Sequence, residues 1–241
     1  MVSQLILTSI IFFFGLAIGS FLNVVIDRLP QGQSLWGRSH CDACHTTLEW
    51  DELIPVLSFC LLKGKCKHCQ QLIGWQYFLV ELTTGFLFVL FFIKHNYIFS
   101  FELLATLTVV SILLSLLVID LKYQIILDEL IVFLFLIGLL SNQSFLVYFL
   151  PGMLFFTMSF WLLNHLSYGR AMGYGDVKLV FCLAMIFPFV AIFLGLYLAF
   201  LTGGLVSVIL ILSKNKGLKS KIAFGPFITL AFILILWFVS F

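Results

Sequence analysis

Charged residues are scarce in this 241-residue chain, at 10% of the sequence. Ordinary soluble domains carry about 25% charged residues. Only 11 residues are acidic, and the net charge of +2 gives no strong attraction to a polyanion. No basic cluster is interleaved with aromatic residues, as a groove for single-stranded nucleic acid requires. The composition excludes a water-soluble fold, and we expect no nucleic acid among the partners.

Apolar residues fill the chain instead, at 62% of the sequence with 29 Phe residues. A transmembrane helix needs about 20 largely apolar residues, which predicts an all-α polytopic membrane protein of about eight helices in a lipid bilayer. The first apolar stretch has no small-residue cleavage site and is too long for a signal peptide, so we expect a retained span. Pro188 is expected to divide one long stretch into two spans. The predicted spans are residues 3–27, 76–95, 100–120, 128–141, 144–166, 177–194, 195–213 and 223–240.

Lysine and arginine gather on one side of this arrangement. Cytoplasmic loops of membrane proteins carry an excess of these residues. If the N-terminus faces outward, the inward segments hold all of them except Lys94. The count predicts that both termini lie outside. The inward residues are Arg28, Arg38, Lys63, Lys65, Lys67, Lys122, Arg170, Lys178, Lys214, Lys216, Lys219 and Lys221.

The one long polar segment, residues 28–75, is the first inward loop. We therefore expect a first transmembrane helix (1–27), a cytosolic cysteine loop (28–75) and a transmembrane bundle (76–241). No internal repeat or low-complexity segment is visible. Any catalytic or ligand-binding residues must then lie in this loop or at the ends of helices.

Two Cys-x-x-Cys knuckles lie in this loop, with the spacing of a tetrahedral thiolate site for Zn²⁺. Disulfides are rare in the reducing cytosol, so we favour zinc over a redox or free-thiol site. A four-cysteine site has no open coordination position for a substrate, and a loop this small needs a metal or another cross-link to fold stably. We therefore expect the metal to have a structural role. The expected ligands are Cys41, Cys44, Cys66 and Cys69.

The positions of the other cysteines and of the histidines near the knuckles do not indicate a particular role. His40, His45 and His68 flank the cysteines and could replace one thiolate, although such a histidine is more often a solvated neighbour. Cys60 and Cys182 lie outside the pattern, and we expect them to pack among apolar residues.

Two aspartates are expected at the cytosolic edge of the membrane. Asp120 closes the third predicted span, and Asp176 opens the sixth after a Gly-rich turn. Acidic residues in membrane helices are costly and usually mark function. A helix N-cap would explain Asp176 alone, but not a second acid at the same depth.

A close pair of carboxyl groups cannot easily hold two negative charges, so it tends to share one proton. Aspartic proteases use this arrangement, in which one carboxylate activates water and its protonated partner donates to the developing oxyanion. Asp128 or Glu129, rather than Asp120, could supply one carboxyl group of the pair. Both could instead be first-turn residues of the fourth span. Asn23 and Asp27, on the first span, are interpreted as structural polar contacts.

With these residues in view, the sequence resembles the type IV prepilin peptidases, membrane aspartic proteases with a Gly-x-Gly-Asp motif. The resemblance covers most of the chain, and the order of its motifs is specific. They are Gly19-Ser20-Phe21-Leu22-Asn23-Val24-Val25, Arg28-Leu29-Pro30, both Cys-x-x-Cys knuckles, Ile54-Pro55-Val56-Leu57-Ser58, Gly64-Lys65-Cys66, Glu81-Leu82-Thr83-Thr84-Gly85, Gly173-Tyr174-Gly175-Asp176-Val177-Lys178 and Phe224-Gly225-Pro226-Phe227.

The resemblance implies that Asp120 and Asp176 are catalytic. It assigns supporting roles to Gly173, Gly175, Lys178 and Asp128. This chain departs from the family's Ile-Pro-Asp element, because Leu127 stands where the proline is usual, which makes Asp128 a less certain helper.

The implied activity is removal of a short basic leader from prepilins or pseudopilins at the cytosolic face of a bacterial cell membrane. Many members also methylate the new N-terminus from S-adenosylmethionine, a reaction associated with the cysteine loop and here with Gly64. The residues alone give no independent support for methylation, since no Gly-rich nucleotide fold is visible. The short loop favours a competence-type enzyme of a Gram-positive bacterium.

Two other classes of protein remain open. Intramembrane acids also serve proton-coupled transporters, although those acids usually lie near the midplane of proteins with internal repeats. A non-catalytic assembly scaffold held by the zinc loop is the third interpretation.

Overall fold

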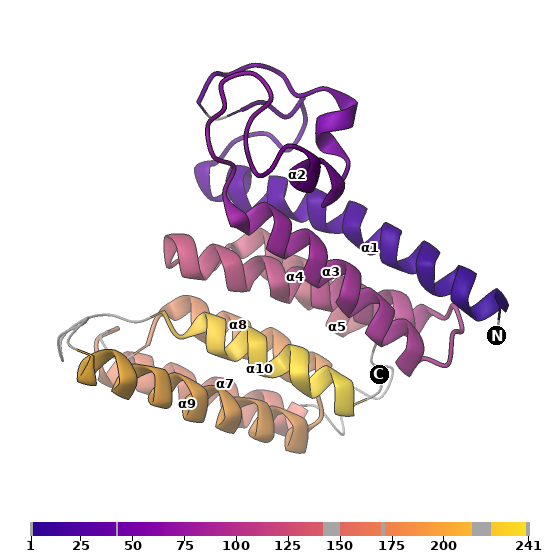
Figure 1. Cartoon of the computed structure of the whole chain (residues 1–241). Helices are drawn as coiled ribbons and strands as arrows, with labels where there is room; N and C mark the ends of the chain where they lie inside the picture. Colours follow the sequence, from indigo (N-terminus) through magenta and orange to yellow (C-terminus); the bar gives the residue numbers. More distant parts are fainter. Residues whose placement is uncertain (1, 42, 142–149, 170–171, 214–222, 240–241) are drawn as a thin grey trace. The chain divides into compact units, whose positions relative to one another are not determined.

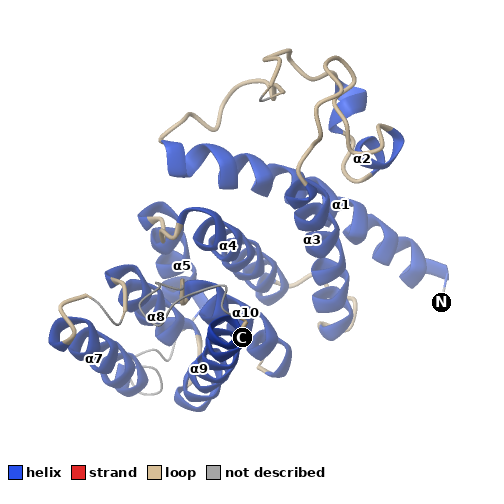
Figure 2. Cartoon of the chain, turned by 60° about the vertical axis from the view of Figure 1, so that its left-hand side comes forward, coloured by secondary structure: helices blue, strands red, loops and turns tan. Residues whose placement is uncertain are grey.

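A computed structural model describes residues 2–41, 43–141, 150–169, 172–213 and 223–239. The chain divides into two compact units, Met1–Leu107 and Thr108–Phe241. The prediction of an all-α chain is confirmed for the described residues (Figures 1 and 2), whose only β-pairings are two isolated bridges. The helices are α1 (Val2–Arg28), α2 (Leu57–Leu61), α3 (Trp75–Lys94), α4 (Phe101–Tyr123), α5 (Asp128–Ser141), α7 (Leu150–Leu166), α8 (Tyr174–Ile186), α9 (Phe189–Leu212) and α10 (Gly225–Phe238), with 3-10 turns η1 (Leu29–Gln31) and η2 (Trp50–Leu53).

In the first unit, α1 and α3 pack along each other (Figure 1). Glycines allow the close approach: a Cβ on Gly15 would lie 2.8 Å from the Gly85 Cα, and one on Gly19 would lie 2.7 Å from the Glu81 Cα. Small residues at such positions let helix backbones meet in membranes. The cysteine loop connects the end of α1 to the start of α3, so it is held at one end of this pair.

In the second unit, α8 packs against both α5 and α7, and α9 packs against α10. Aromatic rings join further elements, with ring centroids 5.1 Å apart for Phe156 and Phe189 and also for Phe187 and Phe232. The unit is therefore a helical bundle in which α8 is an inner element.

Within the part of the chain that the structure describes, four helices are long and apolar enough to cross a membrane: α1, α3, α4 and α9. The chain is thus a multi-pass membrane protein. The helices α5, α7, α8 and α10 have 14, 17, 13 and 14 residues. At about 1.5 Å per residue they are shorter than a hydrocarbon core of about 30 Å. A count of eight spans stays a prediction.

The expectation that Pro188 divides one apolar stretch in two is confirmed, but the predicted boundary between residues 194 and 195 is wrong. The break comes at Phe187 and Pro188, because α8 ends at Ile186 and α9 runs unbroken from Phe189 to Leu212. A proline disfavours helical backbone in the residue before it, and Phe187 is accordingly extended, with φ −109° and ψ 141°. Pro188 then stands as the N-cap of α9.

Part of the charge count lies outside the described residues. The charged residues outside the described ranges are Arg170, Lys214, Lys216, Lys219 and Lys221. Two predicted spans also extend beyond those ranges, at residues 144–149 of the fifth span and residue 240 of the last.

Candidate active site

Asp120 lies one turn inside the end of α4 rather than closing the helix as expected. The helix continues to Tyr123, because Leu121, Lys122 and Tyr123 are compatible with helix although the apolar run has ended. Gln124 then takes a left-handed conformation, φ 56°, and its N–H donates to the Asp120 carbonyl at 3.0 Å. This terminates the helix. The Asp120 residue is 6% exposed.

Asp176 lies in the first turn of α8, with Gly173 as the N-cap. The Gly173 N–H donates to the Asp176 Oδ2 at 3.2 Å. The capping alternative is therefore right in part, since Asp176 satisfies a free N–H at the start of the helix. Among the described residues, this bond occupies one carboxylate oxygen and leaves Oδ1 without a hydrogen-bond partner. Asp176 is 7% exposed.

The Ile126 side chain contacts glycines that lie beside both aspartates. A Cβ on Gly175 would lie 2.9 Å from the Ile126 Cβ, and one on Gly225 would lie 3.5 Å from the Ile126 Cδ1 and would overlap the Asp120 carboxylate. The Gly225 N–H is a hydrogen-bond donor to that carboxylate. The structure thus brings the two predicted acids into one buried cluster.

Asp128 has a different environment. It begins α5 together with Glu129, as the first-turn alternative expects. Its side chain is 67% exposed, and its Oδ1 lies 2.6 Å from the Lys178 Nζ. Lys178 also lies over the Tyr174 ring, 5.4 Å from the centroid. Asp128 and Lys178 therefore form an ion pair that joins α5 to α8, outside the buried cluster.

Gly225 and Ile126 belong to this site, although the sequence analysis names Gly225 only within a family motif and assigns neither of them a role at the aspartates. The Gly225-Pro226 pair signals only the start of a helix, since proline is favoured in the first turn. Ile126 is one apolar residue in a short connection. Neither pattern shows that a backbone N–H or a side chain reaches a carboxylate from a distant part of the chain.

The four predicted zinc ligands gather in the cysteine loop. Their Sγ atoms all lie within 4.8 Å of one another. The two knuckles have matching backbones, because the His40–Thr47 bridge flanks the first and the Lys65–Leu72 bridge flanks the second. In each, the residue after the second cysteine has a positive φ, 55° at His45 and 61° at Gln70. The turns therefore direct all four thiols to one point.

This donor set fits a zinc ion. With Zn–S bonds of about 2.3 Å, tetrahedral geometry places sulfurs about 3.8 Å apart, and the Cys41 and Cys69 sulfurs are 3.8 Å apart. Hydrogen bonds from the Thr46 hydroxyl and backbone lower the pKa of the Cys44 thiol to about 6, whereas desolvation and the neighbouring thiols raise the pKa of Cys69 to about 11. His68 lies 3.7 Å from Glu52 instead.

The two remaining cysteines differ from each other. Cys182 is buried, as expected, and its Sγ lies 3.6 Å from the Ile131 carbonyl. Cys60 is exposed, so the expectation that it packs among apolar residues is wrong. It lies on α2, a helix of 5 residues that is too short to enclose it.

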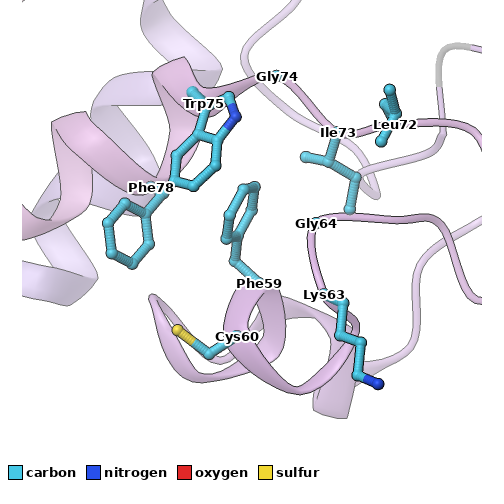
Figure 3. A pocket seen from close by; sticks show the side chains of 9 residues that line it. All are labelled: Phe59, Cys60, Lys63, Gly64, Leu72, Ile73, Gly74, Trp75 and Phe78. Carbon is cyan, nitrogen blue, oxygen red and sulfur yellow. The ribbon is translucent and has the colours of Figure 1, made fainter.

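Gly64 lines a pocket of about 610 Å³ between the loop and the start of α3 (Figure 3). Three aromatic rings gather on one side: the Phe59 centroid lies 5.3 Å from those of Trp75 and Phe78. Gly64 has φ +68°, and a Cβ there would lie 3.1 Å from Phe59. The glycine thus forms a tight left-handed turn in the wall. The pocket is large enough for a small molecule.

The residues interpreted as structural contacts on α1 do bind α3. The Asn23 Nδ2 donates to the Tyr77 carbonyl at 3.1 Å, and the Gln76 Nε2 lies 3.5 Å from the Asp27 Oδ1. Glu81, which the sequence analysis names only within a family motif, accepts a 2.7 Å hydrogen bond from the Val56 N–H. The first two contacts join α1 to α3, and the third attaches the cysteine loop to α3.

Two family models match this chain. Residues 13–95 match the bacterial peptidase A24 N-terminal domain, and residues 107–208 match the type IV leader peptidase family. No solved structure matches the chain.

Several relatives carry the name prepilin leader peptidase/N-methyltransferase. The relative from Aeromonas salmonicida is 32% identical, over 95% of this chain and 90% of its own length. The Klebsiella pneumoniae relative is 39% identical over 71% and 81%, and the Pseudomonas aeruginosa relative is 31% identical over 92% and 88%. Identity of this extent along both chains shows that the protein belongs to the type IV leader peptidase family, peptidase A24.

Proposed function

We propose that Asp120 and Asp176 are the catalytic pair of a membrane aspartic endopeptidase that removes the leaders of type IV prepilins or pseudopilins. The observation that carries this assignment is their burial in one cluster around Ile126, each with a glycine N–H as hydrogen-bond donor. Family membership supplies the reaction class. It favours this activity over proton-coupled transport and over a non-catalytic scaffold.

The chemistry follows from two close carboxyl groups. The ionised one accepts a proton from water as the water oxygen attacks the scissile carbonyl carbon. The protonated one donates to the carbonyl oxygen as negative charge develops there. Collapse of the tetrahedral intermediate breaks the C–N bond, and the proton taken from water goes to the leaving amine. No covalent bond to the enzyme forms.

The test uses purified protein in detergent and a prepilin-like peptide. We expect Asp120→Asn and Asp176→Asn each to reduce kcat by about 1000-fold, within the range for loss of a general acid or base. Asp128→Asn is the matched control, because it removes an acid that is exposed and paired with Lys178. Cleavage at the wild-type rate by either of the first two variants would refute the assignment.

We also propose the topology and the domain division. The chain would span a bacterial cell membrane eight times with both termini outside, so that Asp120 and Asp176 face the cytosol. The first helix (1–27), the cysteine loop (28–75) and the bundle (76–241) would be its three parts. The charge asymmetry supports this orientation. Single cysteines added at Ser100 and at Gln33, with the native cysteines kept, test it. Only the cysteine at position 100 should make the protein react with an impermeant thiol reagent in intact cells.

We propose a second activity, methylation of the new N-terminus from S-adenosylmethionine, with a structural zinc ion. Relatives along the whole chain carry N-methyltransferase in their names. Cys41, Cys44, Cys66 and Cys69 would hold the zinc, which would stabilise the loop. Gly64 would form the wall of the methyl donor's pocket. Labelled S-adenosylmethionine decides the question, since an unlabelled mature N-terminus would mean a peptidase alone.

A further inference from the structure

The first turn of α10 reaches Asp120 with its backbone. Gly225 is the first residue of this helix, and its N–H is a donor to the Asp120 carboxylate. A Cβ on Gly225 would overlap the Asp120 Oδ2. The backbone can approach the carboxylate this closely only because the residue has no side chain.

Other contacts fix the position of this N–H. The buried Thr229 hydroxyl contacts the Gly225 carbonyl at 3.0 Å and the Pro226 carbonyl at 3.1 Å. A Cβ on Gly203 of α9 would lie 3.2 Å from Phe227, so this side chain packs directly on α9. The Phe224 ring lies 4.8 Å from that of Phe200. The start of α10 is thus held firmly against α9.

We propose that Gly225 is a positioning residue of the peptidase site, which orients the Asp120 carboxylate through its backbone and by its lack of a side chain. The inference rests on the proposed catalytic role of Asp120. It adds α10 to the two helices that supply the catalytic acids. The site is then complete only when α10 is in place, although α10 contributes no reacting group.

The carboxylate of Asp176 is held by the same kind of hydrogen bond as that of Asp120. Gly173 donates its N–H to Asp176, and Gly225 does the same for Asp120. Each carboxyl group is therefore oriented by a glycine N–H at the start of a helix. Such a bond fixes the rotation of the carboxyl group, so that its other oxygen can face water or the scissile carbonyl. Orientation of this kind matters because a displacement of about 1 Å can lower the rate 100-fold.

The test compares Gly225→Ala with two other glycine-to-alanine variants. Gly204→Ala adds a methyl group in open space, whereas Gly85→Ala crowds the Leu16 side chain at 2.8 Å, in the other compact unit. We expect Gly225→Ala to lower kcat for leader cleavage about 100-fold with KM unchanged. Both controls should keep the wild-type kcat, even where Gly85→Ala lowers the melting temperature. Wild-type kcat in Gly225→Ala overturns the proposal, as does an equal loss in Gly85→Ala.

A second variant decides the question if Gly225→Ala fails to fold. Thr229→Val removes the hydroxyl contacts to Gly225 and Pro226 with little change in shape. We expect a decrease in kcat of about 10-fold at unchanged KM, whereas wild-type kcat contradicts the proposal. The Asp→Asn variants separate the two hypotheses. If they are inactive while Gly225→Ala and Thr229→Val are fully active, the catalytic assignment stands and the role of Gly225 is wrong.

Discussion

Gly175 lies directly against Ile126, since a Cβ on the glycine would be 2.9 Å from the Ile126 Cβ. Gly175 immediately precedes Asp176 on α8, and Ile126 lies in the connection that follows Asp120. The contact therefore brings the end of α4 to the start of α8. It gives the second glycine of the Gly-x-Gly-Asp motif a physical role that differs from that of the first, which caps the helix.

Gly175→Ala is expected to lower kcat about 100-fold, because the added methyl group pushes Ile126 away and separates the two carboxyl groups. Gly173→Ala is the matched control within the same motif. A Cβ there would lie 3.5 Å from the Asp176 Oδ2, an ordinary contact, so kcat should fall less than about 10-fold. Peptide cleavage assays measure both. An equal loss in the two variants would show that contact with Ile126 is not the cause.

The Lys178–Asp128 ion pair is expected to contribute little to stability. Its side chains are 36% and 67% exposed, and exposed pairs are typically worth about 0.2–1 kcal/mol. A double-mutant cycle with Lys178→Met and Asp128→Asn, followed by thermal unfolding in detergent, should give a coupling energy within that range. It should decrease at high salt, because salt screens exposed charges. Coupling above about 2 kcal/mol, beyond the range for exposed pairs, would indicate that membrane or substrate encloses the pair.

Local sequence patterns predict much of this fold. Apolar runs locate the helices, because burial in lipid requires them, and the four cysteines cluster because two short turns direct their thiols together. Asp120 and Asp176 are identifiable for a similar reason, since acids are rare in such a chain. These features depend on composition and on spacing within a few residues.

Other features depend on contacts between distant segments. The approach of Gly225 to Asp120 joins residues of α10 and α4. No local pattern records it, and a glycine before a proline would look the same at the start of any helix.

Glu81→Ala is expected to loosen the cysteine loop. The Glu81 carboxylate accepts the Val56 N–H at 2.7 Å, and its loss leaves that donor without this acceptor. Because Val56 is only part-buried, the loss is expected to be that of one ordinary hydrogen bond, about 0.5–1.5 kcal/mol. Thermal unfolding in detergent and proteolysis of residues 28–75 should both show the change.

Two variants serve as controls for that anchor. Glu81→Gln keeps an acceptor oxygen, so it should behave like the wild type. Val56 has φ 63°, which is unfavourable for a β-branched residue. Val56→Gly should therefore keep the loop attached, since glycine adopts this conformation easily. If Glu81→Gln loosens the loop as much as Glu81→Ala, the hydrogen bond to Val56 is not the main contact.

Removal of the metal is expected to unfold the cysteine loop while leader cleavage persists. The four sulfurs converge within 4.8 Å, and small loops held by such sites depend on the metal for folding. The aspartates lie in the other compact unit. Purified protein should contain one zinc per chain by elemental analysis. Cys66→Ser should lose it, become sensitive to protease within residues 28–75 and fail to methylate, yet cleave the leader within a few-fold of the wild-type rate.

Cys60→Ser is the matched control, because this cysteine is exposed and lies outside the cluster. It should retain the zinc, the protease resistance of the loop and leader cleavage; methylation is not part of this control, because Cys60 lines the pocket beside Gly64. Two results would contradict a structural metal that serves the loop alone. One is a zinc-free Cys66→Ser protein whose loop resists protease as the wild type does. The other is complete loss of leader cleavage in a variant whose bundle keeps its melting temperature, because the metal would then act on the aspartates as well.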